Sequence, residues 1–119
     1  MPAPFIIDPQ AIENLRALTP GDHDEFLREI VGIFLEDTPK RIAELDQSLA
    51  GNDPLRFTRA AHSVKGSSSN LGAMALQAVA ERLEHQSKQS GLTGLEPMLV
   101  ELKNEFARAA VELRQIIKL

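Results

Sequence analysis

The chain has 119 residues, enough for one domain with a single core but too few for a nucleotide-binding domain plus a substrate domain. The absence of cysteine excludes disulfides, thiolate chemistry and cysteine-ligated zinc. The net charge of −4 argues against nucleic acid or a membrane surface as the main partner, and the lack of Trp and Tyr argues against a base-stacking surface. The first eight residues resemble neither a signal peptide nor a membrane span, so we expect a cytoplasmic protein.

Helical periodicity dominates the chain, and no segment alternates as a strand would. The pair Asp8-Pro9 combines an N-cap residue with a proline at the first helical position, which predicts a short helix over residues 8–18. Its expected apolar stripe consists of Ile12, Leu15 and Leu18.

The second predicted helix spans residues 22–50. Asp22 and Glu25 form a capping-box pattern at its start, and Thr38-Pro39 predicts a kink or a break with a restart. Its inner face is expected to consist of Phe26, Leu27, Ile30, Ile33 and Phe34, continued by Ile42, Leu45 and Leu49.

Three further helices are predicted over residues 53–70, 73–89 and 94–118. Asp53-Pro54 repeats the cap-then-proline signal, and Thr93-x-x-Glu96 is expected to cap the last helix. The fourth helix carries an apolar stripe of Leu76, Val79, Ala80 and Leu83. The fifth carries a long seam of Leu95, Met98, Leu99, Leu102, Phe106, Ala109, Leu113, Ile116 and Ile117.

The sequence therefore predicts an all-α single domain over residues 1–119. Long helices joined by short loops favour an antiparallel up-down-up-down four-helix bundle, with the short additional N-terminal helix as a cap. A coiled-coil dimer is the alternative, but separately capped segments do not make one continuous heptad repeat. We expect a monomer.

The third helix carries the candidate chemistry. Its inner face is mostly small and consists of Phe57, Ala60, Ala61, Val64, Ser68 and Leu71. This assignment places His62 on the solvent side of a rigid helix. An exposed imidazole titrates near neutrality, so much of it is in the neutral, nucleophilic form. Lys65, three residues on, can bring a cation beside whatever group the imidazole carries.

Gly66 lies one turn after His62, on the same face, where a glycine costs about 1 kcal/mol relative to alanine. Three serines follow it, and serine is also a poor helix former. A lone exposed histidine is usually a plain surface residue, and a lone helical glycine usually reflects packing. The combination of His62, Lys65 and Gly66 at positions i, i+3 and i+4 instead indicates an accessible nucleophile with room for another protein's surface.

Residues 61–73, Ala-His-Ser-Val-Lys-Gly-Ser-Ser-Ser-Asn-Leu-Gly-Ala, resemble the signature of histidine-containing phosphotransfer (HPt) domains, His-x-x-Lys-Gly followed by small residues and Leu-Gly. The stretch Phe34–Pro39 is similar to the second helix of bacterial members, which makes a bacterial source the expectation. The resemblance implies phosphoryl transfer between receiver-domain aspartates in multistep phosphorelays. It also implies phosphate on a nitrogen of His62, supported by Lys65, and room for the receiver at Gly66.

The resemblance further implies that the domain has no kinase or phosphatase machinery and needs no cofactor of its own. Its expected partners are receiver domains of response regulators and hybrid histidine kinases, which bring the acidic pocket and its Mg²⁺. Partner docking is assigned to the face around His62, and charge complementarity with the receiver favours Arg59 and Lys65 there. The predicted docking residues are Leu55, Thr58, Arg59, Ser63, Gly66 and Ser69.

A hairpin of the third and fourth helices would place residue 62 opposite residues 81–85, where Glu81, Glu84 and His85 lie. We predict that Glu84 accepts a hydrogen bond from one imidazole N–H and fixes the tautomer; the alternative is a solvated surface acid. No metal site is expected, since Glu81 and His85 lack the paired Glu-x-x-His motifs of di-metal bundles. His23 lies in an acidic helix start that capping already explains.

Three other readings remain open at this point. One is the amino-terminal histidine domain of a chemotaxis-type kinase, which has a similar helix. Another is an adaptor that binds receivers without being phosphorylated, against which the intact His62 argues. The last is a purely structural bundle, which would leave Gly66 unexplained.

Overall fold

The computed structural model describes residues 6–118, and over that range it is built from α-helices without a regular strand. The observed bounds lie within three residues of the predicted ones, and the break that was one alternative at Thr38-Pro39 does not occur. The helices are α1 (Pro9–Leu18), α2 (Glu25–Ala50), α3 (Pro54–Asn70), α4 (Met74–Ser90) and α5 (Glu96–Ile116).

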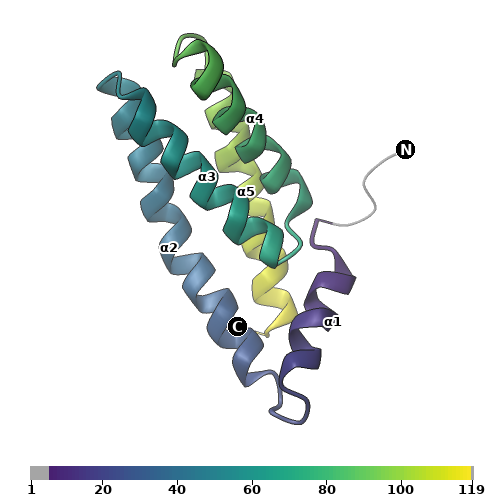
Figure 1. The fold of residues 1–119 in the computed structure, drawn as a ribbon. Coiled ribbons are helices and arrows are strands. Elements are labelled where there is room, and N and C mark those ends of the chain that lie inside the picture. The colour runs from purple at the N-terminus through teal and green to yellow at the C-terminus, as the bar shows by residue number, and fades with distance from the viewer. Residues whose placement is uncertain (1–5, 119) are drawn as a thin grey trace.

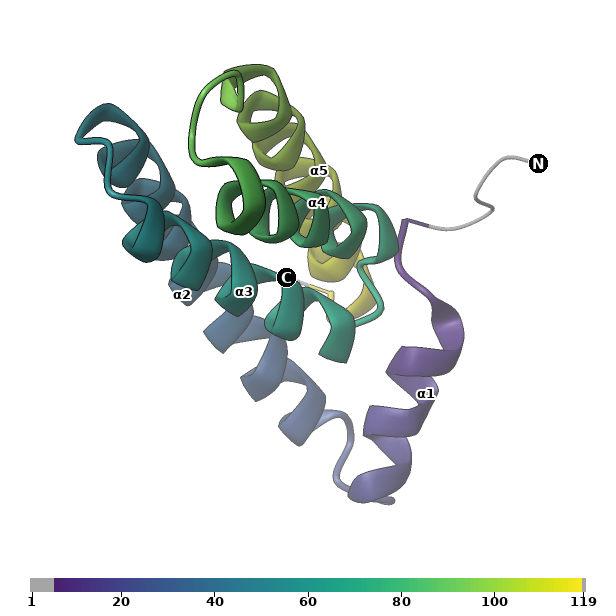
Figure 2. The same cartoon turned by 45° about the horizontal axis from the view of Figure 1, so that its top comes forward.

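Helices α2 to α5 run alternately up and down, which confirms the predicted antiparallel bundle (Figure 1). Helices α3 and α4 have 17 residues each, whereas α2 has 26 and α5 has 21. The longer pair therefore extends past the α3–α4 turn at one end, and α1 packs there (Figures 1 and 2). Ile7 and Ile12 from this N-terminal part join the same buried core as α2 and α5, so α1 covers apolar surface that the shorter helices leave open.

Aspartate caps begin α1 and α3 as predicted. The Asp8 carboxylate accepts from Gln10 N at 3.0 Å, and the Asp53 carboxylate accepts from Arg56 N at 3.2 Å. The predicted start of α2 is three residues early. Asp22 does accept from Phe26 N at 3.0 Å, but left-handed backbone at positions 23 and 24 delays the helix to residue 25.

The prediction that Thr93 caps the last helix is wrong. Helix α5 begins at Glu96, and its N-cap position is Leu95, with no side-chain hydrogen bond. Leu95 is buried in the core, so apolar packing fixes this helix start where the sequence pattern indicated a hydroxyl cap.

No break occurs at Pro39: α2 continues as one helix from residue 25 to residue 50. Proline in a helix interior costs roughly 3 kcal/mol because a hydrogen bond is lost and the ring crowds the preceding turn. Phe34 and Leu45, on either side of it, are both buried, and burial of each large apolar side chain contributes about 1.5–3 kcal/mol. Packing along both halves of the helix thus offsets the proline.

The predicted inner face of α3 is confirmed: all six of its residues are buried. The buried stripes of α4 and α5 are also as predicted, with Met98, Phe106 and Ile116 only partly buried. Two apolar assignments are wrong, since Ile33 is 57% exposed and Leu18 is 67% exposed. In α2 the buried stripe runs through Leu27, Val31 and Phe34, and Ile33 lies beside it.

Gly72 lies in the α3–α4 turn, where its left-handed backbone, with a φ of +73°, favours glycine. A Cβ at this position would lie 2.7 Å from the Cβ of Ala11. The N-terminal segment also bonds to the turn, because Asp8 N donates to Gly72 O at 2.9 Å. These contacts position the hairpin on which the candidate site is built.

Candidate phosphoryl-acceptor site

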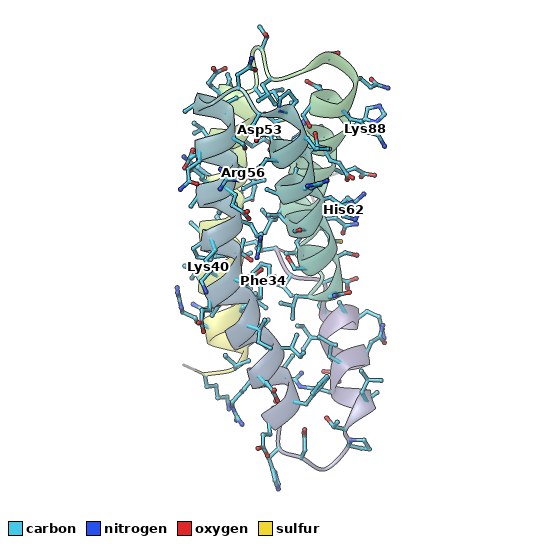
Figure 3. The ribbon with its side chains drawn as sticks, turned by 60° about the vertical axis from the view of Figure 1, so that its left-hand side comes forward. Phe34, Lys40, Asp53, Arg56, His62 and Lys88 are labelled. Atoms are coloured by element: carbon cyan, nitrogen blue, oxygen red, sulfur yellow. The ribbon has the colours of Figure 1, made fainter. Side chains whose placement is uncertain are left out.

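His62 lies at mid-length on α3, and 65% of its side chain is exposed. Its neighbours Ala61 and Val64 are fully buried, so the helix that carries the imidazole is fixed in the core. Figure 3 shows His62 at the outer edge of the molecule. An imidazole on rigid backbone is thereby presented to solvent.

The imidazole contacts one acidic side chain from the neighbouring helix. Nδ1 of His62 lies 2.7 Å from Oε2 of Glu84, within the window that the hairpin geometry predicted. Because an ionised carboxylate only accepts hydrogen bonds, this contact assigns the imidazole proton to Nδ1. The Nε2 lone pair is then the unprotonated, reactive one.

Lys65 binds the same carboxylate. Its Nζ atom lies 2.7 Å from Oε1 of Glu84, so one carboxylate bridges a lysine and a histidine of α3. Burial raises the pKa of Glu84, but hydrogen bonds from Lys65 and His62 outweigh it and hold that pKa below its ordinary value. The hydrogen bond to Glu84 likewise raises the pKa of Lys65. Glu84 is therefore ionised and Lys65 protonated at neutral pH.

Gly66 has no packing role in the fold. Among the residues that the structure describes, no atom apart from the adjacent residues and the nearby backbone of α3 lies within 4 Å of the position that a Cβ would take there. Its backbone is ordinary helix, so neither sterics nor φ requires glycine. The missing side chain leaves the surface one turn from His62 open to another molecule.

Helix α3 continues through the serines after Gly66, and the hydroxyls of two of them bond to its own backbone. Ser67 donates to Ser63 O at 3.1 Å, and the fully buried Ser68 donates to Val64 O at 2.6 Å. A small buried side chain at Ser68 also lets neighbouring helices approach. Ser69 is exposed.

The six residues predicted to dock a partner line one side of α3 with His62. Five are exposed, including Leu55 at 62%, whereas Thr58 is half-buried. Leu55 and Thr58 border a surface hollow of about 420 Å³ that Ser87 and Lys88 of α4 complete. Figure 3 places Lys88 near the His62 edge of the molecule, which adds a positive charge there.

The Hpt domain family model matches residues 29–112. The chain belongs to the Hpt domain family. Members of this family are phosphotransfer carriers and not enzymes in themselves.

A curated relative of this Hpt domain is Multistep phosphorelay regulator 1 of Schizosaccharomyces pombe, which is 30% identical over 80 residues. The match covers 67% of this chain and 27% of the relative, so the chain spans about a quarter of that protein's length. Because this relative is fungal, the bacterial source expected from the sequence stays a prediction.

Solved structures show the same fold. Histidine-containing phosphotransfer protein B from Pseudomonas aeruginosa PAO1 matches with a TM-score of 0.87 and 24% identity, over 98% of this chain and 97% of that one. Histidine-containing phosphotransfer protein MtHPt2 from Medicago truncatula matches with a TM-score of 0.77 and 22% identity, over 95% and 82%. ZmHP2 from maize matches with a TM-score of 0.76 and 24% identity, over 94% and 87%.

The other candidates of the sequence lie apart from the Hpt site. His23 is in the α1–α2 loop with left-handed backbone, and His85 and Glu81 are exposed on α4. Within residues 6–118, no three His, Asp or Glu side chains cluster closely enough to hold a metal ion. No helix in that range is both long and apolar enough to cross a membrane.

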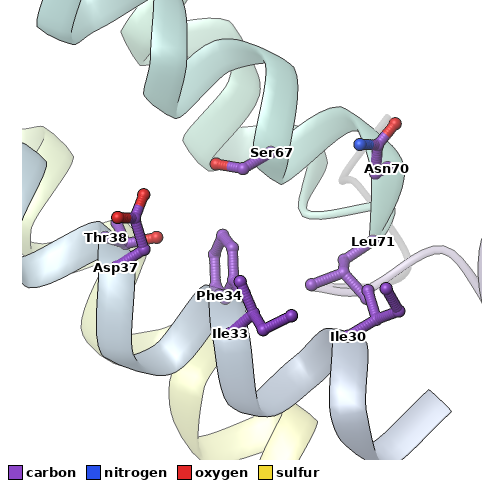
Figure 4. Close-up of a pocket in the computed structure, with 8 residues that line it drawn as sticks. All are labelled: Ile30, Ile33, Phe34, Asp37, Thr38, Ser67, Asn70 and Leu71. Atoms are coloured by element: carbon purple, nitrogen blue, oxygen red, sulfur yellow. The ribbon is translucent and has the colours of Figure 1, made fainter. Parts of the chain in front are cut away.

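The sequence placed Ile33 on the wrong face and did not single out Ser87. Ile33 is exposed above a hollow of about 170 Å³ between α2 and α3, which Phe34, Ser67 and Leu71 also line (Figure 4). Ser87 is 3% exposed and bonds across to α3. Ser87 follows Leu83 by four residues and so continues the buried stripe of α4, a signal that the helical spacing carried although the residue is polar.

Proposed function

We propose that His62 accepts a phosphoryl group from the aspartyl phosphate of a receiver domain and passes it to the aspartate of another receiver. The observation that carries this proposal is the exposed imidazole with Nδ1 held by Glu84, which leaves Nε2 free to attack. The family and the phosphorelay relative support it.

The transfer balances without an added oxidant or cofactor. The Nε2 lone pair attacks phosphorus, the N–P bond forms, and the P–O bond to the aspartate breaks, so that the carboxylate leaves with the bonding electrons. The Nδ1 proton stays on the ring, which becomes a cationic phosphoimidazole. The Glu84 carboxylate stabilises that positive charge at 2.7 Å, and the reverse sequence of bonds delivers the phosphoryl group to the next aspartate.

Docking is assigned to the open side of α3. Gly66 lets the receiver's surface approach, and Arg59 and Lys88 offer positive charge to its acidic pocket. In this scheme Mg²⁺ belongs to the receiver, and His62, Lys65 and Glu84 are the domain's own contribution. The cytoplasmic location, the monomeric state and the lack of kinase or phosphatase activity belong to the same proposal.

The test is incubation with a receiver phosphorylated on its aspartate, with wild type and His62→Gln in parallel. Acid-labile label on the wild type alone is the expected result. Label on both proteins would place the acceptor elsewhere, and label on neither with intact receiver binding would favour an adaptor. A parallel incubation with a histidine kinase catalytic domain and ATP separates the chemotaxis-type alternative, in which the kinase phosphorylates His62 directly.

A further inference from the structure

A second polar contact joins α3 and α4 about one turn from the His62–Glu84 pair. Oγ1 of Thr58 and Oγ of Ser87 lie 2.7 Å apart. Thr58 precedes His62 by four residues, and Ser87 follows Glu84 by three, so the two contacts are successive ties across one antiparallel pair. Ser87 is 3% exposed, which places this tie inside the molecule.

Either hydroxyl can be the donor in the hydrogen bond between Thr58 and Ser87. Ser87 Oγ lies 3.1 Å from Glu84 O, and Thr58 Oγ1 lies 2.8 Å from Pro54 O. Either Thr58 donates to Ser87, which donates to the Glu84 carbonyl, or Ser87 donates to Thr58, which donates to the Pro54 carbonyl. Each hydroxyl has a partner in both cases, so the hydroxyl of the buried Ser87 is satisfied.

The Thr58–Ser87 hydrogen bond fixes the position of α4 along α3, which the apolar contacts between these helices constrain only weakly. The small inner face of α3, with Ala60 and Ala61 fully or nearly buried, sets how closely α4 approaches. Smooth contact between small residues resists sliding along the helix axes only weakly. A hydroxyl pair works within a range of about 2.5–3.0 Å, so it specifies the register of one helix against the other.

We propose that Thr58 and Ser87 are a positioning pair, which sets the register of α4 against α3 and so holds the Glu84 carboxylate on Nδ1 of His62. The kinetic consequence rests on the proposed function, whereas the effect on the imidazole tautomer does not. The His62 tautomer is measured without a receiver, so an effect of the Ser87 hydroxyl on that tautomer must act through the contact between α3 and α4.

The first test is Ser87→Ala, measured in two ways. Nitrogen-15 NMR of the unphosphorylated protein reads the His62 tautomer, and label transfer from a phosphorylated receiver reads the rate. We expect a mixture of tautomers in place of the Nδ1–H form, and a rate loss of about tenfold, because a small misplacement of a positioning group has a large kinetic cost. The matched control is Ser48→Ala, since Ser48 is equally buried but bonds to the carbonyls of Glu44 and Leu45 in its own helix.

Thr58→Val removes the partner hydroxyl at similar size, and Thr58→Ser restores it. We expect Thr58→Val to reproduce the tautomer change, Thr58→Ser to keep the wild-type tautomer, and the Thr58→Val/Ser87→Ala double variant to lose no more than either single variant. A His62 tautomer unchanged in both folded single variants overturns the proposal. If Ser87→Ala does not fold, the Thr58 variants decide. A wild type that takes no label defeats the proposed function instead and leaves the tautomer measurement valid.

Discussion

Nδ1 of His62 lies 2.7 Å from Oε2 of Glu84, although 22 positions of sequence separate the two residues. The other oxygen of the same carboxylate binds Lys65. Glu84 therefore links the proposed nucleophile to Lys65. An exposed imidazole would otherwise exchange between tautomers, so this link determines which nitrogen is available.

Replacement of Glu84 by Gln should weaken transfer. The amide carries no charge to stabilise the phosphoimidazole cation or to retain Lys65, and we expect a rate loss of about tenfold with a mixed His62 tautomer. Label transfer and nitrogen-15 NMR measure the two effects. Glu81→Gln, an exposed change on the same helix, is the control and should leave both at wild-type values. An unaltered rate and tautomer in Glu84→Gln would show that Glu84 is only a surface acid.

The same carboxylate should make stability depend on pH. Its pKa in the folded protein is below the ordinary value of 4.5, so its stabilising contribution is complete above that pH and is lost as the pH falls through the folded-state pKa. The hydrogen bond to Glu84 raises the pKa of Lys65, so stability depends on pH at the alkaline end as well. The stabilising contribution of Lys65 is complete below pH 10.5 and is lost as the pH rises through the folded-state pKa.

Denaturant unfolding of wild type and Glu84→Gln across this range checks the pH dependence. The difference between the two free energies of unfolding should be constant near neutral pH and should shrink toward acid. A difference that grows as the pH falls below 4.5 would contradict an ionised Glu84 in the folded state.

Gly66→Gln should impair receiver binding and leave the fold intact. A Cβ at this position meets no neighbouring atom within 4 Å, and glutamine is a better helix former by up to about 1 kcal/mol, so the melting temperature should hold or rise. Binding and label transfer should both fall, because the side chain stands where the receiver approaches. Gly32→Gln provides a control, since a Cβ there is equally unobstructed on α2. Undiminished transfer by Gly66→Gln would remove Gly66 from the docking surface.

Gly72→Ala should destabilise the domain by roughly 1–3 kcal/mol. The substitution combines a φ of +73° with a Cβ placed 2.7 Å from that of Ala11. Gly21→Ala separates the two causes, because Gly21 has a φ of +86° but open space around it. Thermal unfolding should show a larger loss for Gly72→Ala, and equal losses would show that crowding against α1 contributes nothing.

Much of the fold follows from local sequence. Aspartate-proline pairs begin α1 and α3, and spacing of apolar residues identified the buried faces of α3, α4 and α5. Local signals failed where packing opposed them. Helix α2 runs through Pro39, and α5 has the buried Leu95 at its N-cap in place of a hydroxyl residue, because burial of apolar side chains outweighs those local preferences.

The sequence by itself determined the reactive helix: His62, Lys65 and Gly66 lie on one turn, so their spacing alone places them together on its face. Only the tertiary structure decided what lies beside them. The bond from Glu84 and the exposure of Ile33 depend on the register between helices, and that register is set by the α3–α4 turn at Gly72, by packing across the core and, in the proposal above, by the Thr58–Ser87 pair. The helical period fixes the angular positions of side chains around one helix, whereas contacts between helices depend on the axial position of one helix relative to the other.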